Sequence, residues 1–291
     1  MSAKPCAAPT PCELEHLYGI ESVQFINKLS DSHRCPCARL PEQEATAVDG
    51  GASRDASDAV SWMKLRPRLR VVAFEPLPRN CVEARRKLAP FGARARLTCS
   101  ALAANAGTAA FLDRGAATLG SLQGSVGTLA GYEGTRSVRV DVTTLDAVLG
   151  NCVGPCKPIF LVKLDLQGSE VAALRGATKL LRAQRIAWIY AEFDPSLLRG
   201  AGTSSTELLE LLEQHGFACH NFRERSWRPW NWYLSPLNES TFWTNILCGH
   251  RSVAFTKAAD WKGRLRQSYC AVQKGKLGRL ECGQSTHTHL T

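Results

Sequence analysis

The sequence predicts an α/β protein with a doubly wound, mostly parallel sheet. Apolar runs of strand length recur along the chain, and segments with a helical spacing of apolar residues stand between them. Strands that alternate with helices are typical of a parallel sheet covered by helices on both faces. No internal repeat is visible in the chain.

The predicted elements follow in chain order. Strands are expected at residues 45–48, 70–74, 95–100, 107–112, 137–142, 159–164, 186–192, 217–222 and 245–248. Helices are expected up to Lys64 and at residues 80–88, 170–182 and 206–215. The strands at 107–112 and 137–142 are expected to be antiparallel, because they are short and a glycine-rich segment separates them.

Helix ends can be assigned from single residues. Asp55, Ser57 or Asp58 is expected to cap the first helix, since a side-chain oxygen at this position accepts a bond from a free backbone N–H. Gly216 stands where the last helix should end, because glycine is the usual residue just beyond a helix C-terminus.

The chain divides into three parts by composition. Residues 1–43 mix proline, cysteine and polar residues and are interpreted as an N-terminal appendage. Residues 44–256 carry the strand and helix pattern and form the predicted catalytic domain. Residues 257–291 are basic and polar and are interpreted as a flexible tail.

The composition excludes some classes of protein. No stretch approaches the ~20 apolar residues that span a bilayer, and the N-terminus has no apolar leader, so a cytoplasmic location without a membrane span is expected. The formal charge of +10 is interpreted as solvated surface plus the basic tail. A nucleic-acid partner is not favoured, because it needs a basic stripe on one face.

The sequence has 12 cysteines. Without a secretory leader they are expected to be mostly reduced. Cys35 and Cys37 lie two residues apart, which is not a common zinc spacing, and Cys152 and Cys156 have only one possible partner group within reach of the sequence argument. No metal site is therefore expected.

Two predicted strand ends carry the residues of a nucleoside-binding site. The first strand runs into Asp49-Gly50-Gly51-Ala52-Ser53, where glycine lets a ligand approach the backbone and the next helix offers free N–H groups. Glu75 directly follows the second strand, where a carboxylate accepts bonds from both ribose hydroxyls. In a doubly wound sheet these two ends are neighbours.

The first loop also separates two classes of cofactor. The dinucleotide fingerprint G-x-G-x-x-G is missing, and Asp55 stands where a glycine would admit a pyrophosphate. Its negative charge would repel that group, whereas a cationic cofactor tolerates it. The loop therefore favours S-adenosylmethionine over a dinucleotide, and a dehydrogenase is the less favoured enzyme class.

Five segments together resemble the FkbM family of methyltransferases. They are AVDGGAS, VVAFEPLPRN, SALAANAGTAAFL, VDVTTLDAVL and FLVKLDLQGSEVAALRGA, which follow one another in the order of the family between residues 45 and 222. The resemblance implies a class I, Rossmann-like fold that binds S-adenosylmethionine. It also implies methyl transfer to an oxygen of a sugar, polyketide or related metabolite.

The resemblance assigns roles to individual residues. Those implied to contact the cofactor are Asp49, Gly51, Ala52 and Ser53 at the methionine part, Glu75 at the ribose, and Ser100 and Ala101 at the adenine. Those implied to lie near the transferred methyl group are Lys163, Asp165 and Glu170. The sequence departs from the family at Asp55, Ala104 and Gln167, where the family has a glycine, an acid and a glutamate. Asp55 is expected to bind the methionyl ammonium instead.

Methyl transfer to a hydroxyl needs a base that takes the proton. Asp165 is the first candidate and Glu192 or Asp194 the second, because these acids end neighbouring predicted strands. The alternative for Asp165 is a structural role, either as a helix cap or as the ion-pair partner of Lys163. Lys163 itself is expected to orient an acid or the acceptor.

The acceptor side is predicted from residues 222–243, which hold four of the seven tryptophans interleaved with arginine. Such residues stack on sugar rings or bases, so Trp230 and Trp232 are candidate substrate contacts together with Glu170. The alternative is a packed flap over the sheet edge.

The predicted function is therefore an S-adenosylmethionine-dependent methyltransferase that acts on a hydroxyl of a small molecule or glycan. The three departures from the family keep open a non-catalytic S-adenosylmethionine-binding relative. The charge and the tryptophan-rich segment keep open an RNA-modifying enzyme, although no base-methylation motif of the Asn-Pro-Pro-Tyr kind is present.

Overall fold

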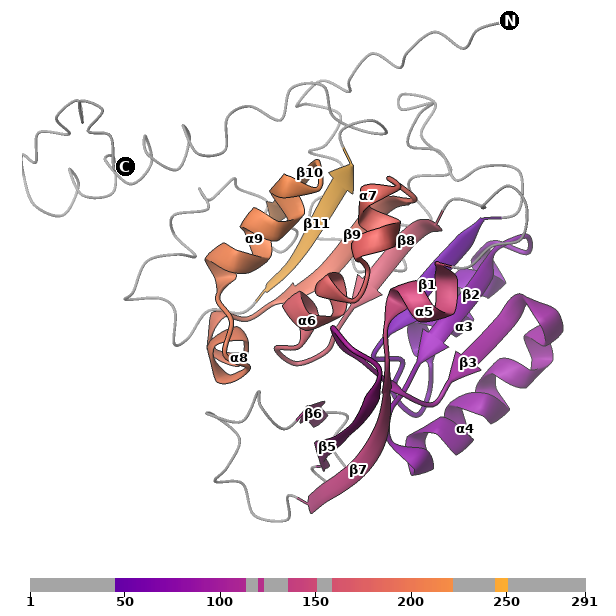
Figure 1. Ribbon diagram of the computed structural model, residues 1–291. Helices are drawn as coiled ribbons and strands as arrows, with labels where there is room; N and C mark the ends of the chain where they lie inside the picture. The colour runs from indigo at the N-terminus through magenta and orange to yellow at the C-terminus, as the bar shows by residue number, and fades with distance from the viewer. Residues whose placement is uncertain (1–44, 114–119, 123–135, 151–158, 222–243, 251–291) are drawn as a thin grey trace, which may run out of the picture.

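The computed structural model describes residues 45–113, 120–122, 136–150, 159–221 and 244–250. Within this part of the chain, a seven-stranded sheet has the order β10-β11-β9-β8-β1-β2-β3 (Figure 1). The predicted appendage (1–43) and tail (257–291) lie outside the described residues, so these domain boundaries stay predictions.

Five strands of this sheet are parallel. They are β1 (Thr46–Gly50), β2 (Arg70–Phe74), β3 (Ala95–Thr98), β8 (Ile159–Leu164) and β9 (Ile186–Phe193). The chain first builds outward from β1 to β3 and then returns to place β8 on the other side of β1. The strand order therefore reverses between β1 and β8, where a doubly wound sheet opens a crevice for ligands.

The last two strands close the sheet at the β9 edge. β11 (Thr244–His250) is antiparallel to β9 and to β10 (Phe217–Asn221). Both strands agree with the predicted late strands, and a disulfide joins Cys219 to Cys248 at directly opposite positions of the pair.

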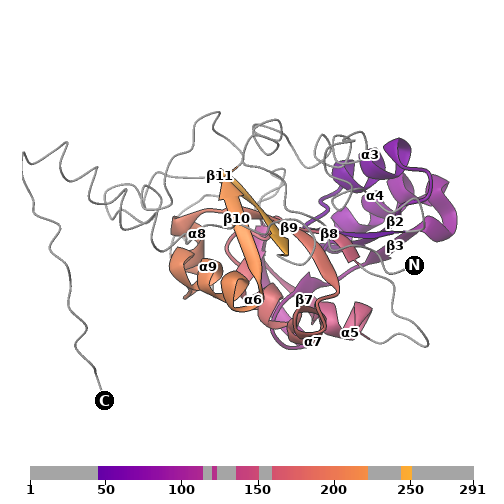
Figure 2. The same cartoon turned by 90° about the horizontal axis from the view of Figure 1, so that it is seen from above.

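Helices cover both faces of the sheet (Figure 2). α3 (Ser57–Leu65), α4 (Pro78–Leu88) and the 3-10 helix η2 (Ala89–Arg94) belong to one layer. The other layer contains α5 (Leu145–Leu149), α6 (Glu170–Arg175), α7 (Thr178–Arg182), α8 (Pro195–Gly200) and α9 (Ser205–Gln214).

A separate apolar core lies under each helical layer. On the α3 side, Trp62 and Trp188 are almost completely buried, and on the other side the leucines of α6, α7 and α9 pack on Val162 and Ile189. A parallel sheet buried on both faces needs apolar residues at consecutive positions, which is why β8 is apolar along most of its length. The predicted fold class is confirmed.

A small second sheet projects from the carboxyl end of the main one (Figure 1). Its order is β4-β7-β5-β6, with bounds Ala101–Leu102 for β4, Arg136–Thr143 for β7, Gly107–Asp113 for β5 and Gly120–Leu122 for β6. β5 and β7 are antiparallel, as predicted. Phe111 of β5 packs with Leu77, so this sheet borders the ends of the parallel strands.

The predicted cap of the first helix is wrong. The N-cap residue is Ala56, in the left-handed conformation, and neither Asp55, Ser57 nor Asp58 caps the helix. Instead, the Oδ2 atom of Asp49, at the end of β1, accepts a bond from the N–H of Ala59 at 3.3 Å. One free N–H group of the helix is thus satisfied from the strand and not from the preceding loop.

The helix predicted at 170–182 is wrong as a single element. It is divided into α6 and α7 at Gly176, where a β-carbon would lie 2.1 Å from the carbonyl oxygen of Ala103. The second helix then needs its own cap. The Asp146 carboxylate provides it by accepting bonds from the N–H groups of Lys179 and Leu180 at 2.8 and 3.0 Å.

The expectation of mostly reduced cysteines is wrong for the cysteines in the described residues. Cys81 is bonded to Cys99 and Cys219 to Cys248, so all four of them are in disulfides. In the described residues no helix is long and apolar enough to cross a membrane.

The cap of α7 leads to a test of the fold. We expect Asp146→Ala to lower the free energy of unfolding by about 1–2 kcal/mol, because two backbone N–H groups lose their acceptor. Urea denaturation measures the change. Asp141→Ala, an exposed aspartate of β7, is the matched control and should cost less than about 0.5 kcal/mol. Equal losses in the two variants would contradict the assigned role of Asp146.

Candidate functional site

A cavity of about 510 Å³ lies at the carboxyl ends of β1, β2, β8 and β9. Eleven of the residues predicted from the sequence line it: Gly51, Ala52, Ser53, Asp55, Glu75, Ser100, Ala101, Lys163, Asp165, Glu192 and Asp194. They come from loops that are far apart in the chain, and the reversal of strand order brings them together.

Four predicted residues are not part of the cavity wall as the structure describes it. Asp49 and Glu170 are 0% and 1% exposed and lie behind the lining residues. Trp230 and Trp232 lie outside the described residues, so their predicted contacts with the acceptor stay predictions.

The loop after β1 is held tightly between two other strand ends. The N–H groups of Gly51 and Ala52 both donate to the carbonyl oxygen of Phe74, at 3.1 and 2.9 Å. Gly51 has a φ of +84°, and a β-carbon there would lie 2.1 Å from the carbonyl oxygen of Asp165. Only glycine fits this turn, which sets the floor of the cavity between β2 and β8.

One hydroxyl of this loop has no partner among the described residues. Ser53 lines the cavity. Its Oγ atom is buried and neither accepts nor donates a hydrogen bond within this part of the chain. Buried polar groups are normally bonded, so a ligand with a polar group near Ser53 would complete the site.

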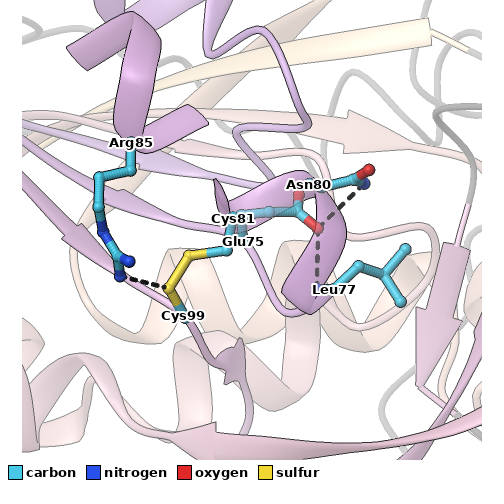
Figure 3. The surroundings of a disulfide bond; sticks show 6 residues. All are labelled: Glu75, Leu77, Asn80, Cys81, Arg85 and Cys99. Atoms are coloured by element: carbon cyan, nitrogen blue, oxygen red, sulfur yellow. Dashed lines mark hydrogen bonds between the residues drawn. A yellow bond between two sulfur atoms is a disulfide. The ribbon is translucent and has the colours of Figure 1, made fainter. Parts of the chain in front are cut away.

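Glu75 directly follows β2 and is only 5% exposed, and hydrogen-bond donors fix the orientation of its carboxylate (Figure 3). Its Oε1 atom accepts bonds from the N–H of Leu77 at 2.9 Å and from the side-chain amide of Asn80 at 3.2 Å. The N–H of Ser53 is a further donor to the carboxylate. Burial raises the pKa of Glu75, and these three donors oppose that rise.

The Cys81–Cys99 disulfide supports the same wall of the cavity (Figure 3). Cys81 follows Asn80 in the first turn of α4, and Cys99 precedes Ser100 at the end of β3. The guanidinium of Arg85 donates to the Sγ atom of Cys99 at 3.3 Å. The disulfide therefore ties the start of α4, where Asn80 holds Glu75, to the end of β3, next to Ser100 and Ala101, which are predicted to contact the adenine.

Lys163 forms the centre of an ion-pair cluster on the opposite wall. Its Nζ atom lies 3.1 Å from Asp58, 3.3 Å from Asp49 and 3.6 Å from Asp165. Burial lowers the pKa of Lys163, but these three carboxylates together raise it well above its ordinary value. The three carboxylates therefore favour the cationic form of Lys163, and its role in orienting an acid or the acceptor stays a prediction.

Burial shifts the pKa of Asp49, whose carboxylate lies behind Lys163, in the opposite direction. It raises the pKa of Asp49 to about 6, against the lowering effect of Lys163. Asp49 is therefore ionised at neutral pH and protonated in mild acid.

The second candidate bases differ in their surroundings. The Oδ1 atom of Asp194 accepts bonds from the N–H groups of Ser196 and Leu197 and caps α8, so this oxygen already serves the helix. Glu192 is 6% exposed, and its Oε2 atom accepts a bond from the Gln167 amide at 2.8 Å. Asp165 is more accessible, because 45% of its side chain is exposed.

The alternative roles of Asp165 can now be separated. It is not the cap of α6, because the N-cap residue of that helix is Ser169. It does pair with Lys163, as the other alternative requires. The ion pair leaves the carboxylate accessible from the cavity, so it is compatible with a role as a base.

Glu170 supports this region from below. Its Oε1 atom accepts a bond from the N–H of Leu166 at 2.9 Å. Burial, and then the charge of Glu192, raise the pKa of Glu170 well above its ordinary value. Burial thus favours the protonated form of Glu170, which lies under the cavity floor and does not line the cavity in this geometry.

The charges of the lining residues indicate which ligand fits. The wall contains six carboxylates, and among its described residues Lys163 is the single cationic side chain. An excess of negative charge favours a cationic ligand and repels a phosphate. The residues present therefore fit S-adenosylmethionine, which carries a sulfonium and an ammonium group, better than a dinucleotide.

Sequence reasoning missed three residues of the site. Asp58 was considered only as a helix cap, but it is the nearest acid to Lys163. The sequence assigns no role to Asn80, although its side-chain amide donates a hydrogen bond to Glu75. Gln167 was noted only as a departure from the family, but its amide bonds both Asp165 and Glu192. The first two lie on helices next to predicted site loops, which is a usable signal.

The comparison with protein families gives one match over more than half of the chain. Residues 49–219 match the model described as "Methyltransferase FkbM domain". No curated protein matches the chain.

Several solved structures of methyltransferases are similar to the chain at low identity. Precorrin-6y C5,15-methyltransferase from Geobacter metallireducens is 16% identical, with a TM-score of 0.36 over 69% of this chain and 73% of that one. Cofactor-bound Rv0187 from MTB is 13% identical, with a TM-score of 0.39 over 86% and 99%. A human methyltransferase 10 domain containing protein is 8% identical, with a TM-score of 0.42 over 78% and 79%.

The raised pKa of Asp49 can be tested through stability. A carboxyl whose folded-state pKa rises from 3.8 to about 6 binds its proton more tightly in the folded protein, so stability is lost as pH rises between these values. We expect the stability of Asp49→Asn, relative to that of the wild type, to increase by roughly 2.4 kcal/mol between pH 4 and pH 7. Urea denaturation at several pH values measures this difference, with Asp141→Asn as control. A difference that does not change with pH would contradict the assignment.

Proposed function

Because this chain belongs to the FkbM methyltransferase domain family, we propose that it transfers a methyl group from S-adenosylmethionine to a hydroxyl of a sugar, polyketide or similar small metabolite. One observation carries the cofactor part of the proposal. Glu75, held by three N–H donors, and the Gly51 turn face one cavity whose lining is strongly acidic.

Each end of the proposed cofactor has matching residues in the cavity. The carboxylate of Glu75 is the acceptor for the ribose hydroxyls, since its orientation is already set by Leu77 and Asn80. The Gly51–Ser53 turn and Asp55 would hold the methionine part. Ser100 and Ala101 line the same cavity and would contact the adenine.

The proposed chemistry needs a base at the opposite end. S-adenosylmethionine supplies the methyl group when it is bound, and the acceptor hydroxyl must lose its proton as the new bond forms. We assign this role to Asp165, whose carboxylate is accessible and pairs with the ammonium of Lys163 at 3.6 Å. Lys163 thereby orients the base, and Glu192 is the second candidate.

The charge of the cavity also bears on the alternatives. Six lining carboxylates repel the phosphates of RNA and of a dinucleotide, so an RNA-modifying enzyme and a dehydrogenase are less well supported. A non-catalytic binder would keep the Glu75 end of the site but show no methyl transfer. The expectation that the chain has no metal site stays a prediction.

The location of the protein is a separate question. A cytoplasmic location stays a prediction, and the two disulfides argue against it, because disulfides persist mainly in oxidising compartments.

Two measurements test the proposed function. Titration calorimetry with S-adenosylhomocysteine should show saturable binding to one site. Tritiated S-adenosylmethionine should then label at least one member of a panel of methyl hexosides, methyl 6-deoxyhexosides and hydroxylated lactones. Binding without labelling of the panel or of a metabolite extract would favour the non-catalytic alternative. Absence of binding would refute the proposal.

Glu75 provides the test of the cofactor site. We expect Glu75→Gln to weaken S-adenosylhomocysteine binding about 10- to 100-fold, because a charged acceptor for two hydroxyls is lost. The glutamine amide would also oppose the N–H donors of Leu77 and Asn80. Calorimetry measures the change, and Glu83→Gln on the exposed face of α4 is the control. Unchanged affinity would remove Glu75 from the site.

Asp165 provides the test of the chemical step. We expect Asp165→Asn to lower kcat by about 10²–10⁴-fold, because the amide cannot take the proton, while the affinity for S-adenosylhomocysteine stays within about twofold. Initial rates with the labelled acceptor measure this, and Glu192→Gln is compared in parallel. If only Glu192→Gln loses turnover, the base is Glu192 and not Asp165.

A further inference from the structure

Gln167 lies between the two candidate bases and contacts both. Its Nε2 atom donates to the Oδ1 atom of Asp165 at 3.1 Å and to the Oε2 atom of Glu192 at 2.8 Å. A primary amide nitrogen carries two hydrogens, so one group satisfies both bonds at the same time. The side chain thus bridges the carboxyl ends of β8 and β9.

The backbone at this position is strained. Gln167 has a φ of +53°, which is uncommon for a residue with a β-carbon, and Gly168 follows with a φ of +101°. A β-carbon at Gly168 would lie 2.4 Å from the carbonyl oxygen of Leu197, so α8 holds this turn in place. Strain of this kind is retained where the surrounding structure requires it, often at functional sites.

The surroundings of the amide are crowded with charge. Besides its two partners, the titratable groups on the elements that meet here are Lys163 of β8, Asp49 of β1, Asp58 of α3, Glu170 of α6 and Asp194 at the cap of α8. Lys163 is already shared by three carboxylates, and its nearest approach to Asp165 is 3.6 Å. A neutral donor such as Gln167 therefore joins two acids without adding another negative charge.

We infer that Gln167 is a positioning residue, whose amide holds the side chains of Asp165 and Glu192 at a fixed separation at the acceptor end of the cavity. This inference rests on the proposed function, in which Asp165 takes the proton of the acceptor. The amide orients the base by fixing its Oδ1 atom, so that the carboxylate is presented to the acceptor in one orientation.

Replacement by glutamate gives the sharpest test, because the size of the side chain hardly changes. In Gln167→Glu a third carboxylate would stand about 3 Å from two others, and such groups retain a proton between them. A carboxyl with a raised folded-state pKa destabilises the protein increasingly as pH rises through the range between its unfolded and folded values. We expect the Tm of this variant to fall by about 3 °C or more, relative to wild type, between pH 5 and pH 8.

The chain offers a matched control for this measurement. Gln184, in the turn before β9, is exposed and has a φ of +51°, close to that of Gln167. Gln184→Glu makes the same chemical change in the same backbone conformation, but away from the cavity. Its Tm relative to wild type should not fall as pH rises. If the two variants respond equally to pH, the inference is overturned, whatever the outcome of the activity assays.

A second variant separates the amide from the backbone. Gln167→Gly relieves the strained φ and removes the amide, so its Tm should equal or exceed that of the wild type. With the acceptor labelled in the panel assay, kcat should fall at least about 10-fold while S-adenosylhomocysteine affinity is unchanged. In Gln167→Glu the acid limb of the pH–kcat profile should also move to higher pH. Full activity of Gln167→Gly would overturn the positioning role.

The two proposals fail in different ways. If the wild-type protein labels no acceptor, the proposed function fails, while the pH dependence of Tm still decides whether Gln167 bridges the two carboxylates. If labelling succeeds but both Gln167 variants behave as wild type, only the positioning role is overturned.

Discussion

The buried ammonium of Lys163 determines much of the arrangement of the site. A cation in the interior requires anionic partners, and Lys163 draws them from β1, α3 and the loop after β8 as Asp49, Asp58 and Asp165. Asp49 in turn satisfies the N-terminus of α3, so one cluster sets both the start of a helix and the floor of a cavity. Removal of Lys163 would leave the buried carboxylate of Asp49 without its cationic partner, so the position of this acid depends on the ammonium.

The parts of the fold that depend on local sequence were predicted well. β1, β2, β8 and β9 appear where apolar runs of strand length occur, because both faces of these strands are buried. The two wrong helix predictions have a common cause in tertiary contacts. Asp49 replaces a local cap at α3, and α6 ends at Gly176, where the close approach of the Ala103 carbonyl leaves no room for a β-carbon. Neither partner is close in sequence, so no local pattern reveals it.

The same distinction applies to the site. Glu75 and the turn at Gly51 follow directly from their positions after strands, and the cavity contains both. The bridge from Gln167 to Glu192 joins residues 25 positions apart, and only the parallel alignment of β8 with β9 brings them together. Asp58 is a comparable case, since its partner Lys163 lies on a strand much later in the chain. Sequence therefore indicates which residues face the cavity but not which hydrogen bonds and ion pairs they form with one another.

The cross-strand disulfide has a topological consequence for the end of the domain. Cys219 and Cys248 lie on adjacent strands that flank residues 222–243 in the chain. The covalent bond makes this stretch a closed ring, whose two ends cannot separate even if a peptide bond within it is cleaved. A protease that cuts there would yield one covalent molecule, and β11 would remain attached to the sheet until a reductant opens the ring.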